Sequence, residues 1–218
     1  MINNHVLQRT FQMRFETNVG TCFTLDIENR QYLATAFHVI NGLQEEGKIS
    51  IFHDNQWKPL EVAVAWASEE EDIAILIPEK SLSAAYQLEP SSAGLTLGQD
   101  VYFCGFPYEL QMNDPKLNRG FPLPLVKKGI ISALLEGVFV IDAQNNRGFS
   151  GGPVVFQSRG SDKFRVAAVV SGYRLGYETV VLNDEETELG YNSGLTIAYD
   201  LRNAVRAISA IAGANEGV

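Results

Sequence analysis

Short strand-like runs separated by turn residues follow one another along the chain, and no other feature restricts the fold as strongly. Two similar sets of about six runs flank a connector at residues 78–98 that is rich in Ser, Ala, Pro and Gly. This pattern predicts an all-β fold of two packed six-stranded antiparallel β-barrels with a C-terminal α-helix. The expected strands are residues 20–25, 31–36, 48–53, 60–67 and 72–77 in the first set, and 100–104, 126–133, 137–141, 153–156, 164–171 and 194–197 in the second.

The end of the chain carries a pattern typical of a helix. Apolar residues recur at spacings of three and four from Leu201 to Ile211, and Asp200 is a suitable N-cap. We therefore expect a helix at about residues 199–212.

Charge and composition exclude several classes of protein. A formal net charge of -9 argues against nucleic-acid binding, which requires a basic face that neutralises phosphates. No apolar run approaches the roughly 18 residues of a membrane span, and the N-terminus has no signal-peptide pattern. Cys22 and Cys104 lie in strand-like runs and are expected to be buried thiols rather than a disulfide. Together these features predict a cytoplasmic protein.

The segment Gly148 to Gly152 has the pattern G-x-S-x-G, with Ser150 at its centre. In α/β-hydrolases this pattern forms a nucleophile elbow, and the acid and the His of the triad both follow the Ser. Here His5, His38 and His53 all precede Ser150, and strands do not alternate with helices. The α/β-hydrolase interpretation is therefore excluded by residue order.

The order His, Asp, Ser does give a complete triad. A Ser hydroxyl is a poor nucleophile until a neighbouring base takes its proton, and His titrates near neutral pH. His38 follows one apolar strand and Asp72 begins another, so both suit the end of a barrel. We predict a first barrel at residues 1–90 that carries His38 and Asp72, and a second at residues 91–218 that carries Ser150.

Further segments match a known family. Residues 101–107 (VYFCGFP), 128–134 (KGIISAL) and 141–144 (IDAQ) stand at family spacing before the Ser150 loop. Over about residues 18–198 the sequence resembles trypsin-like serine peptidases, which have the chymotrypsin fold, and specifically the disulfide-free bacterial type represented by the Deg/HtrA protease domain. The resemblance implies an endopeptidase that cleaves protein or peptide substrates through an acyl-enzyme and needs no cofactor.

The same resemblance assigns an oxyanion hole to Gly148, Phe149 and Ser150, with the N–H groups of Gly148 and Ser150 as donors. Such donors stabilise the charge that develops on the substrate carbonyl oxygen. Phe149 occupies the position where zymogen-activated trypsins carry an Asp that pairs with a new N-terminus. Activation by release of an N-terminal amine is therefore not expected.

Substrate preference is implied less sharply. By family position, Gln144 would lie at the bottom of the primary side-chain pocket, and Ser171, Gly172 and Tyr173 would form its walls. Gln144 offers an amide rather than a charge, which favours a small or uncharged residue before the scissile bond. The segment 169–171 is expected to pair with the substrate backbone as an added strand.

Two loops and one absence separate this chain from the Deg/HtrA pattern. The sequence shows no PDZ-like domain after the predicted helix, so tethering of peptides by such a domain is not expected. The long polar loop at residues 108–125 is a candidate lid, partner-binding loop or activation switch. The acidic stretch at residues 178–191 is expected to be a specificity or regulatory loop.

The remaining polar residues suggest no other chemistry. His5 and His53 are interpreted as surface residues, and the histidines and cysteines lack the spacing of zinc ligands. Serine endopeptidase is therefore the first hypothesis, with a regulatory protein partner as a further expectation. A catalytically silent trypsin-fold interaction module and an esterase with the same triad stay open as alternatives.

Overall fold

The first six strands form a closed barrel in the computed structural model, which describes residues 2–83, 87–114, 118–158, 160–182 and 185–215. Their order around the barrel is β1-β2-β3-β6-β5-β4, and all six pairings are antiparallel. Alternating apolar residues of these strands fill the interior, as the period-two pattern requires. The strands are β1 (Thr10–Phe15), β2 (Asn18–Ile27), β3 (Arg30–Thr35), β4 (Glu46–His53), β5 (Gln56–Ser68) and β6 (Ile73–Pro78).

The second sheet has seven strands in the order β11-β8-β9-β10-β13-β12-β7. β11 also pairs with β12, which joins six of these strands into a ring. The prediction of an all-β fold with two barrels and a C-terminal helix is thus confirmed, with one parallel pairing, between β7 and β12, added to it. The strands are β7 (Glu89–Pro90), β8 (Asp100–Gly105), β9 (Leu125–Leu134), β10 (Val138–Asp142), β11 (Pro153–Gln157), β12 (Phe164–Leu182) and β13 (Glu185–Asp200).

The C-terminal helix packs against the first barrel rather than the second. α2 (Arg202–Asn215) begins where Asp200 Oδ1 accepts a hydrogen bond of 2.9 Å from the Arg202 amide, close to the predicted cap. Leu201, Ala204 and Ile208 join the apolar core of the first barrel. The other α-helix, α1 (Asn4–Leu7), is a single turn, and neither helix is long and apolar enough to cross a membrane.

Cys22 and Cys104 are fully buried free thiols, as predicted. Cys22 lies on β2 and Cys104 on β8, and both side chains belong to the core cluster of the first barrel. Burial raises the pKa of both thiols well above the ordinary value of a cysteine, because it disfavours the charged thiolate. The two cysteines therefore behave as small apolar side chains.

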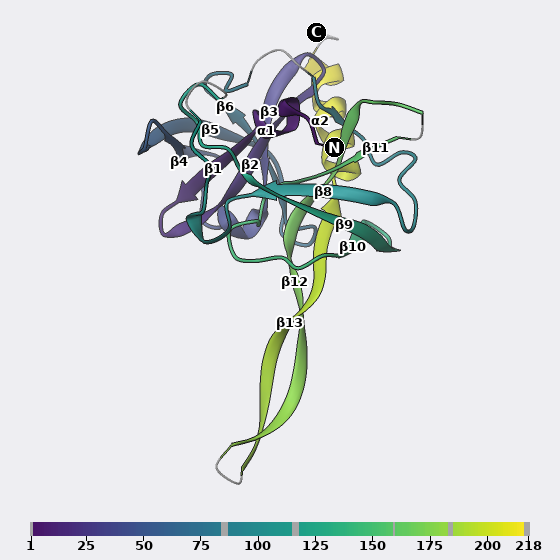
Figure 1. The fold of residues 1–218 in the computed structure, drawn as a ribbon. Coiled ribbons are helices and arrows are strands. Elements are labelled where there is room, and N and C mark those ends of the chain that lie inside the picture. Colours follow the sequence, from purple (N-terminus) through teal and green to yellow (C-terminus); the bar gives the residue numbers. More distant parts are fainter. Residues whose placement is uncertain (1, 84–86, 115–117, 159, 183–184, 216–218) are drawn as a thin grey trace.

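The acidic stretch at residues 178–191 is not a loop, and this prediction was wrong. β12 and β13 continue past the second sheet and pair with each other from Leu175↔Asn192 to Leu182↔Glu185, so the stretch lies in strands apart from residues 183 and 184, which are outside the described ranges. We call residues 174–182 and 185–194 the arm, because β13 pairs with β10 only from Leu195 onward. The arm projects far from both barrels (Figure 1).

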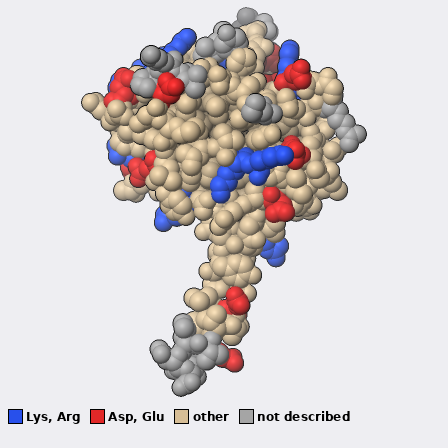
Figure 2. Space-filling model, viewed as in Figure 1, with Lys and Arg blue, Asp and Glu red and all other residues tan. Residues whose placement is uncertain are grey.

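The arm is a narrow two-stranded ribbon held by cross-strand contacts. Gly176 lies opposite Tyr191, and Tyr177 lies opposite Gly190, so that each ring covers the glycine across from it. Aromatic side chains that cover cross-strand glycines compensate for the missing side chain. Figure 2 shows a mostly uncharged arm surface with acidic side chains towards its outer end.

Candidate active site

His38 and Asp72 are held together by three hydrogen bonds. After β3 ends at Thr35, the chain enters a short 3₁₀ turn, η1 (Phe37–Val39), which carries His38. His38 Nδ1 lies 2.8 Å from Asp72 Oδ2 and 3.0 Å from Oδ1, and the His38 amide donates to Oδ1 at 2.9 Å. The contact to Nδ1 leaves Nε2 as the ring nitrogen available for a reaction, and the His38 side chain is 51% exposed.

The backbone fixes Asp72 in an uncommon conformation. Asp72 precedes β6 with φ at 45°, a left-handed value that Asp tolerates better than most residues. Its carbonyl oxygen accepts a hydrogen bond from the Phe37 amide at 3.1 Å, next to the His38 amide that binds its carboxylate. Two consecutive amides of η1 therefore hold both ends of Asp72, which sets the direction of its carboxylate.

The hydrogen bonds around Asp72 keep its carboxylate ionised. Burial raises the pKa of this group, but hydrogen bonds from the His38 ring, the Ser171 hydroxyl and the His38 amide outweigh burial and bring the pKa below its ordinary value. An ionised carboxylate is the form that only accepts hydrogen bonds, as it does here from the His38 ring.

Ser171 links Asp72 to Ser150. Its hydroxyl donates to Asp72 Oδ2, and its carbonyl oxygen accepts a hydrogen bond of 2.9 Å from the Ser150 hydroxyl. No hydrogen bond joins Ser150 to His38 directly among the described residues. The three predicted triad residues are thus gathered at one place by a chain of contacts through Ser171, whose contact to Asp72 was not predicted.

Gly148 and Gly151 give the Ser150 loop a shape that other residues do not fit. Both have positive φ values, 103° and 84°, which only glycine adopts without strain. A Cβ at Gly148 would overlap the carbonyl oxygen of Phe106, and one at Gly151 would overlap the carbonyl oxygen of Thr21. The loop therefore packs directly on the backbone of both barrels.

The amides of the predicted oxyanion hole fall into two kinds. Those of Gly148 and Ser150 make no hydrogen bond in the described part of the chain, so both remain open to a ligand. The Phe149 amide donates to the Asn146 carbonyl at 3.2 Å, and the Phe149 ring is buried 5.1 Å from the ring of Phe103. Phe149 therefore supports the loop from the core and does not supply a donor.

Thr21 is a buried residue on β2 that sequence reasoning missed. Its hydroxyl donates to the Gly148 carbonyl at 2.7 Å and accepts from the Phe106 amide at 3.2 Å. Its amide donates to the Ser150 carbonyl at 2.8 Å. Thr21 thus holds the carbonyls on both sides of Phe149 from the opposite barrel. No local signal marks a mid-strand Thr for this role, because it depends on how the two barrels pack.

The predicted specificity residues lie on two segments of the second barrel. Gln144 is exposed, and its carbonyl accepts from Lys127 Nζ at 2.6 Å. The next residue, Asn145, is the buried amide, and its Nδ2 donates to the Gly172 carbonyl at 2.8 Å. Gly172 and Tyr173 follow Ser171 on β12, and Tyr173 is partly exposed. Asn145, which sequence reasoning missed, is therefore the buried amide that holds the Gly172 wall, and the pocket role of Gln144 stays a prediction.

The strand proposed to receive substrate begins later than predicted. Val169 already pairs with Pro153 of β11 and with Tyr199 of β13. Val170 exchanges hydrogen bonds of 2.7 and 2.8 Å with Gly151 and Gly152, and it also pairs with β13. Both edges of β12 are thus occupied up to Val170, so the prediction was wrong for these two residues, and only Ser171 onward is open.

The loop at residues 108–125, described except for 115–117, supports the Ser150 loop instead of standing apart from it. The Tyr108 amide donates to the Arg147 carbonyl at 3.0 Å. Farther along, the Phe121 ring lies 4.9 Å from the ring of Phe11, and the Arg119 carbonyl lies 2.9 Å from His53 Nε2. These contacts join the segment before Gly148 to the first barrel.

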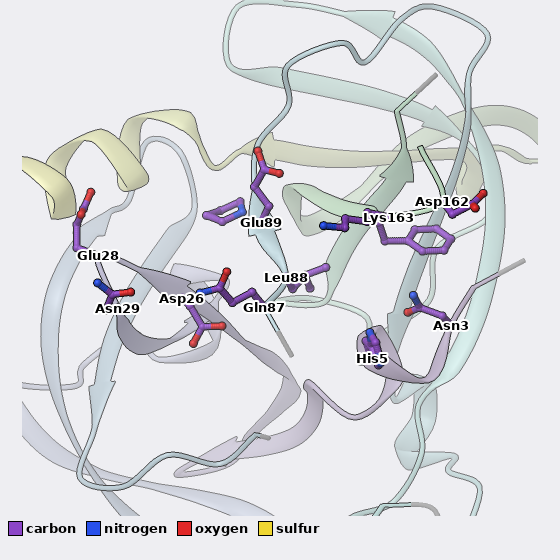
Figure 3. Close-up of a pocket in the computed structure, with 12 residues that line it drawn as sticks. Asn3, His5, Asp26, Glu28, Asn29, Gln87, Leu88, Glu89, Asp162 and Lys163 are labelled. Carbon is purple, nitrogen blue, oxygen red and sulfur yellow. The ribbon is translucent and has the colours of Figure 1, made fainter. Parts of the chain in front are cut away.

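A pocket of about 880 Å³ lies elsewhere on the molecule and contains none of the predicted site residues (Figure 3). Asn3 and His5 line it from the N-terminal segment, and Asp26 and Glu28 line it from the end of β2 and the turn that follows. It is therefore separate from the cluster of His38, Asp72 and Ser150.

Comparisons with known proteins bear on the family and the fold of the chain. Residues 20–161 match the family model described as a trypsin-like peptidase domain. No curated protein matches the sequence. The solved serine endoprotease from Yersinia pestis has a similar fold, with a TM-score of 0.62 and 18% identity, over 93% of this chain and 62% of that one. The chain thus spans less than two thirds of that relative, and the matched family region includes His38, Asp72 and Ser150.

Proposed function

The chain belongs to the trypsin-like peptidase family, and from this premise we propose that it is a serine endopeptidase with Ser150 as nucleophile, His38 as general base and Asp72 as the carboxylate that orients the base. The observation that carries the proposal is the continuous contact from His38 through Asp72 and Ser171 to the Ser150 hydroxyl, built from both barrels. The two buried free thiols support action in the reducing cytoplasm.

The reaction begins with a rotation of the Ser150 side chain. In the free protein its hydroxyl donates to the Ser171 carbonyl, so it must turn to give its proton to His38 Nε2. The oxygen then attacks the substrate carbonyl carbon, and Asp72 stabilises the imidazolium that forms. His38 next protonates the leaving amine, which gives an acyl-enzyme, and a water activated by His38 hydrolyses the ester.

The amides of Gly148 and Ser150 would receive the negative charge of the tetrahedral intermediate. Both are unengaged and already fixed by the loop, so they need no reorganisation during the reaction. The peptide units that carry these two amides are held through their carbonyls, Arg147 by the Tyr108 amide at 3.0 Å and Phe149 by the Gly152 amide at 2.8 Å. Thr21 binds the carbonyls of Gly148 and Ser150 and so fixes the next peptide unit after each donor. Thr21 is thus proposed as a positioning residue for the oxyanion hole.

The direct test of the proposed function is labelling with a fluorophosphonate probe, which reacts with activated serines. We expect wild type to be labelled at Ser150 and Ser150→Ala to remain unlabelled, while the matched control Ser209→Ala, on α2, is labelled like wild type. A wild type that stays unlabelled would favour the silent interaction module. Labelling together with turnover of small esters, but of no member of a peptide library, would favour the esterase.

Thr21→Val tests how the oxyanion hole is held. Valine keeps the shape of Thr21 but removes the hydroxyl that bonds both groups, which leaves the Gly148 carbonyl and the Phe106 amide only their mutual hydrogen bond of 3.4 Å. We expect kcat to fall by about 10- to 100-fold with little change in KM, less than the 10²–10³-fold loss of a whole oxyanion donor. Unfolding free energy should fall by about 1–3 kcal/mol. Thr21→Ser keeps the hydroxyl and should recover most of kcat; equal losses in the two variants would contradict the proposed role.

A further inference from the structure

We propose that the outer edge of β12 binds the substrate as an added antiparallel strand along the arm, so that the enzyme selects long extended segments with basic residues far before the scissile bond. This inference rests on the proposed peptidase function and concerns the substrate class of the same site. It extends the recognition surface well beyond the residues next to Ser150.

The first argument is the continuity of a free strand edge with the reacting serine. Up to Val170, β12 has a neighbour on each side. From Ser171 to Leu182, its only partner among the described strands is β13, with register shifts at Val170/Gly172 and Tyr173/Leu175. Side-chain hydrogen bonds reach the carbonyls of Ser171, Gly172 and Arg174, and no other strand covers the second edge in the described part of the chain. That edge starts at the Ser171 carbonyl, which contacts the Ser150 hydroxyl. A strand added there would place its own carbonyl groups at the nucleophile.

The second argument is that the arm is incomplete as a two-stranded ribbon. Isolated two-stranded ribbons are marginal in water, and a third strand is usually needed for stability. Large apolar side chains on the arm are exposed: 46% for Leu175, 63% for Tyr177, 49% for Leu189 and 51% for Tyr191. A third strand would pack its side chains against those of β12. The free edge of β13 leads instead to β10, so a strand added there would not reach Ser150.

Charge and chain direction together indicate what the far part of the substrate carries. An antiparallel strand with its scissile bond at Ser150 runs outward towards its own N-terminus, which places about its eighth residue before that bond opposite Glu178. The exposed charged side chains of the outer arm are acidic, namely Glu178, Glu186 and Glu188, whereas Arg174 lies at its base. Opposite charges across neighbouring strands attract, so Lys or Arg is favoured at the distant positions.

The test compares wild type with a variant that lacks the arm. Because Leu175 lies opposite Asn192, residues 176–191 can be replaced by Asn-Gly, which forms a two-residue hairpin turn between them. Both proteins are assayed on fluorogenic peptides that share four residues before the scissile bond and extend N-terminally to twelve. For wild type we expect kcat/KM to rise about tenfold or more with length. The variant should match wild type on the shortest peptide and gain nothing from extension.

Two changes in the long peptides distinguish strand addition from non-specific binding to the arm. N-methylation at successive positions should lower kcat/KM of wild type at every second residue, because alternate amides face the neighbouring strand. Peptides with Lys at the eighth position should have about threefold higher kcat/KM than peptides with Glu there at low salt. This difference in kcat/KM should disappear at about 0.5 M salt. If N-methylation lowered kcat/KM without alternating between successive positions, or if Lys gave no higher kcat/KM than Glu, the proposed mode of binding would be overturned.

The outcomes also separate this inference from the proposed function. If wild type neither reacts with the fluorophosphonate nor cleaves any peptide, the peptidase assignment itself fails. If wild type cleaves short peptides but gains nothing from extension, or the variant gains as much as wild type, the role of the arm fails alone. A wild-type dimer that becomes a monomer without the arm, with no dependence on length, would show that a second copy covers the arm and would also overturn the inference.

Discussion

His38→Ala should lower kcat for peptide hydrolysis by about 10⁶-fold, the loss seen when the base of a Ser-His-Asp triad is removed. Without the imidazole, no group accepts the Ser150 proton or protonates the leaving amine. The residual rate would come from binding and from the amides of Gly148 and Ser150, which the substitution leaves in place. Steady-state kinetics on a cleavable peptide measures the effect.

The fold of this variant should be preserved, because half of the His38 side chain is exposed and its amide bond to Asp72 remains. Circular dichroism and the melting temperature provide the check. His5→Ala serves as the matched control, since His5 lines the separate pocket, and it should retain wild-type kcat. A His38→Ala enzyme with more than a hundredth of wild-type kcat would contradict the role of His38 as base.

Asp72→Asn should lower kcat by about 10⁴-fold, because an amide neither holds the required tautomer of His38 nor stabilises its imidazolium form. The effect should appear in kcat and kcat/KM to a similar extent, as expected for an interaction that matters most in the transition state. Glu70→Gln, two residues earlier on an exposed turn, is the matched control and should leave kcat unchanged. Equal kinetics of the two variants would remove Asp72 from the triad.

The same substitution should change the acid side of the stability profile. In the folded state the pKa of Asp72 lies below its ordinary value of 3.8. Such a group stabilises the fold above the unfolded-state pKa, and the contribution is lost as pH falls through the folded-state value. The difference in melting temperature between wild type and Asp72→Asn should therefore be largest above about pH 4 and should shrink as the pH falls below that value. A difference that widens with acid would have the wrong sign.

The parts of the fold that local patterns encode were predictable. Strands such as β6 and β8 lie within a residue or two of their expected bounds, because apolar runs ending at turn residues leave little choice. β1 (Thr10–Phe15) was missed, since buried Thr10 and Gln12 hide its apolar alternation. The outer arm was predicted as a loop, because its glycines and acidic residues weaken the sequence pattern of a strand. Tyr177 and Tyr191 stabilise these strands only by contacts across the pair, which the sequence does not show.

The residues of the candidate site were likewise predictable only where local sequence encodes them. His38, Asp72 and Ser150 could be found because residue order and strand context are properties of the sequence. The hold of Thr21 on the Ser150 loop could not be found, because it joins residues more than a hundred positions apart in two barrels. Asn145, and not Gln144, is the buried amide. This depends on which of two adjacent side chains turns inward, and a sequence position alone does not decide it.

The packing of α2 on the first barrel also has a consequence for the order of folding. Its strands lie within residues 10–78, but Leu201, Ala204 and Ile208, which complete its core, follow the second barrel in the sequence. Contacts between such distant parts of a chain form late, because the intervening loop must close first. We therefore expect the core of the first barrel to close late in folding, after the second barrel has brought α2 back to it.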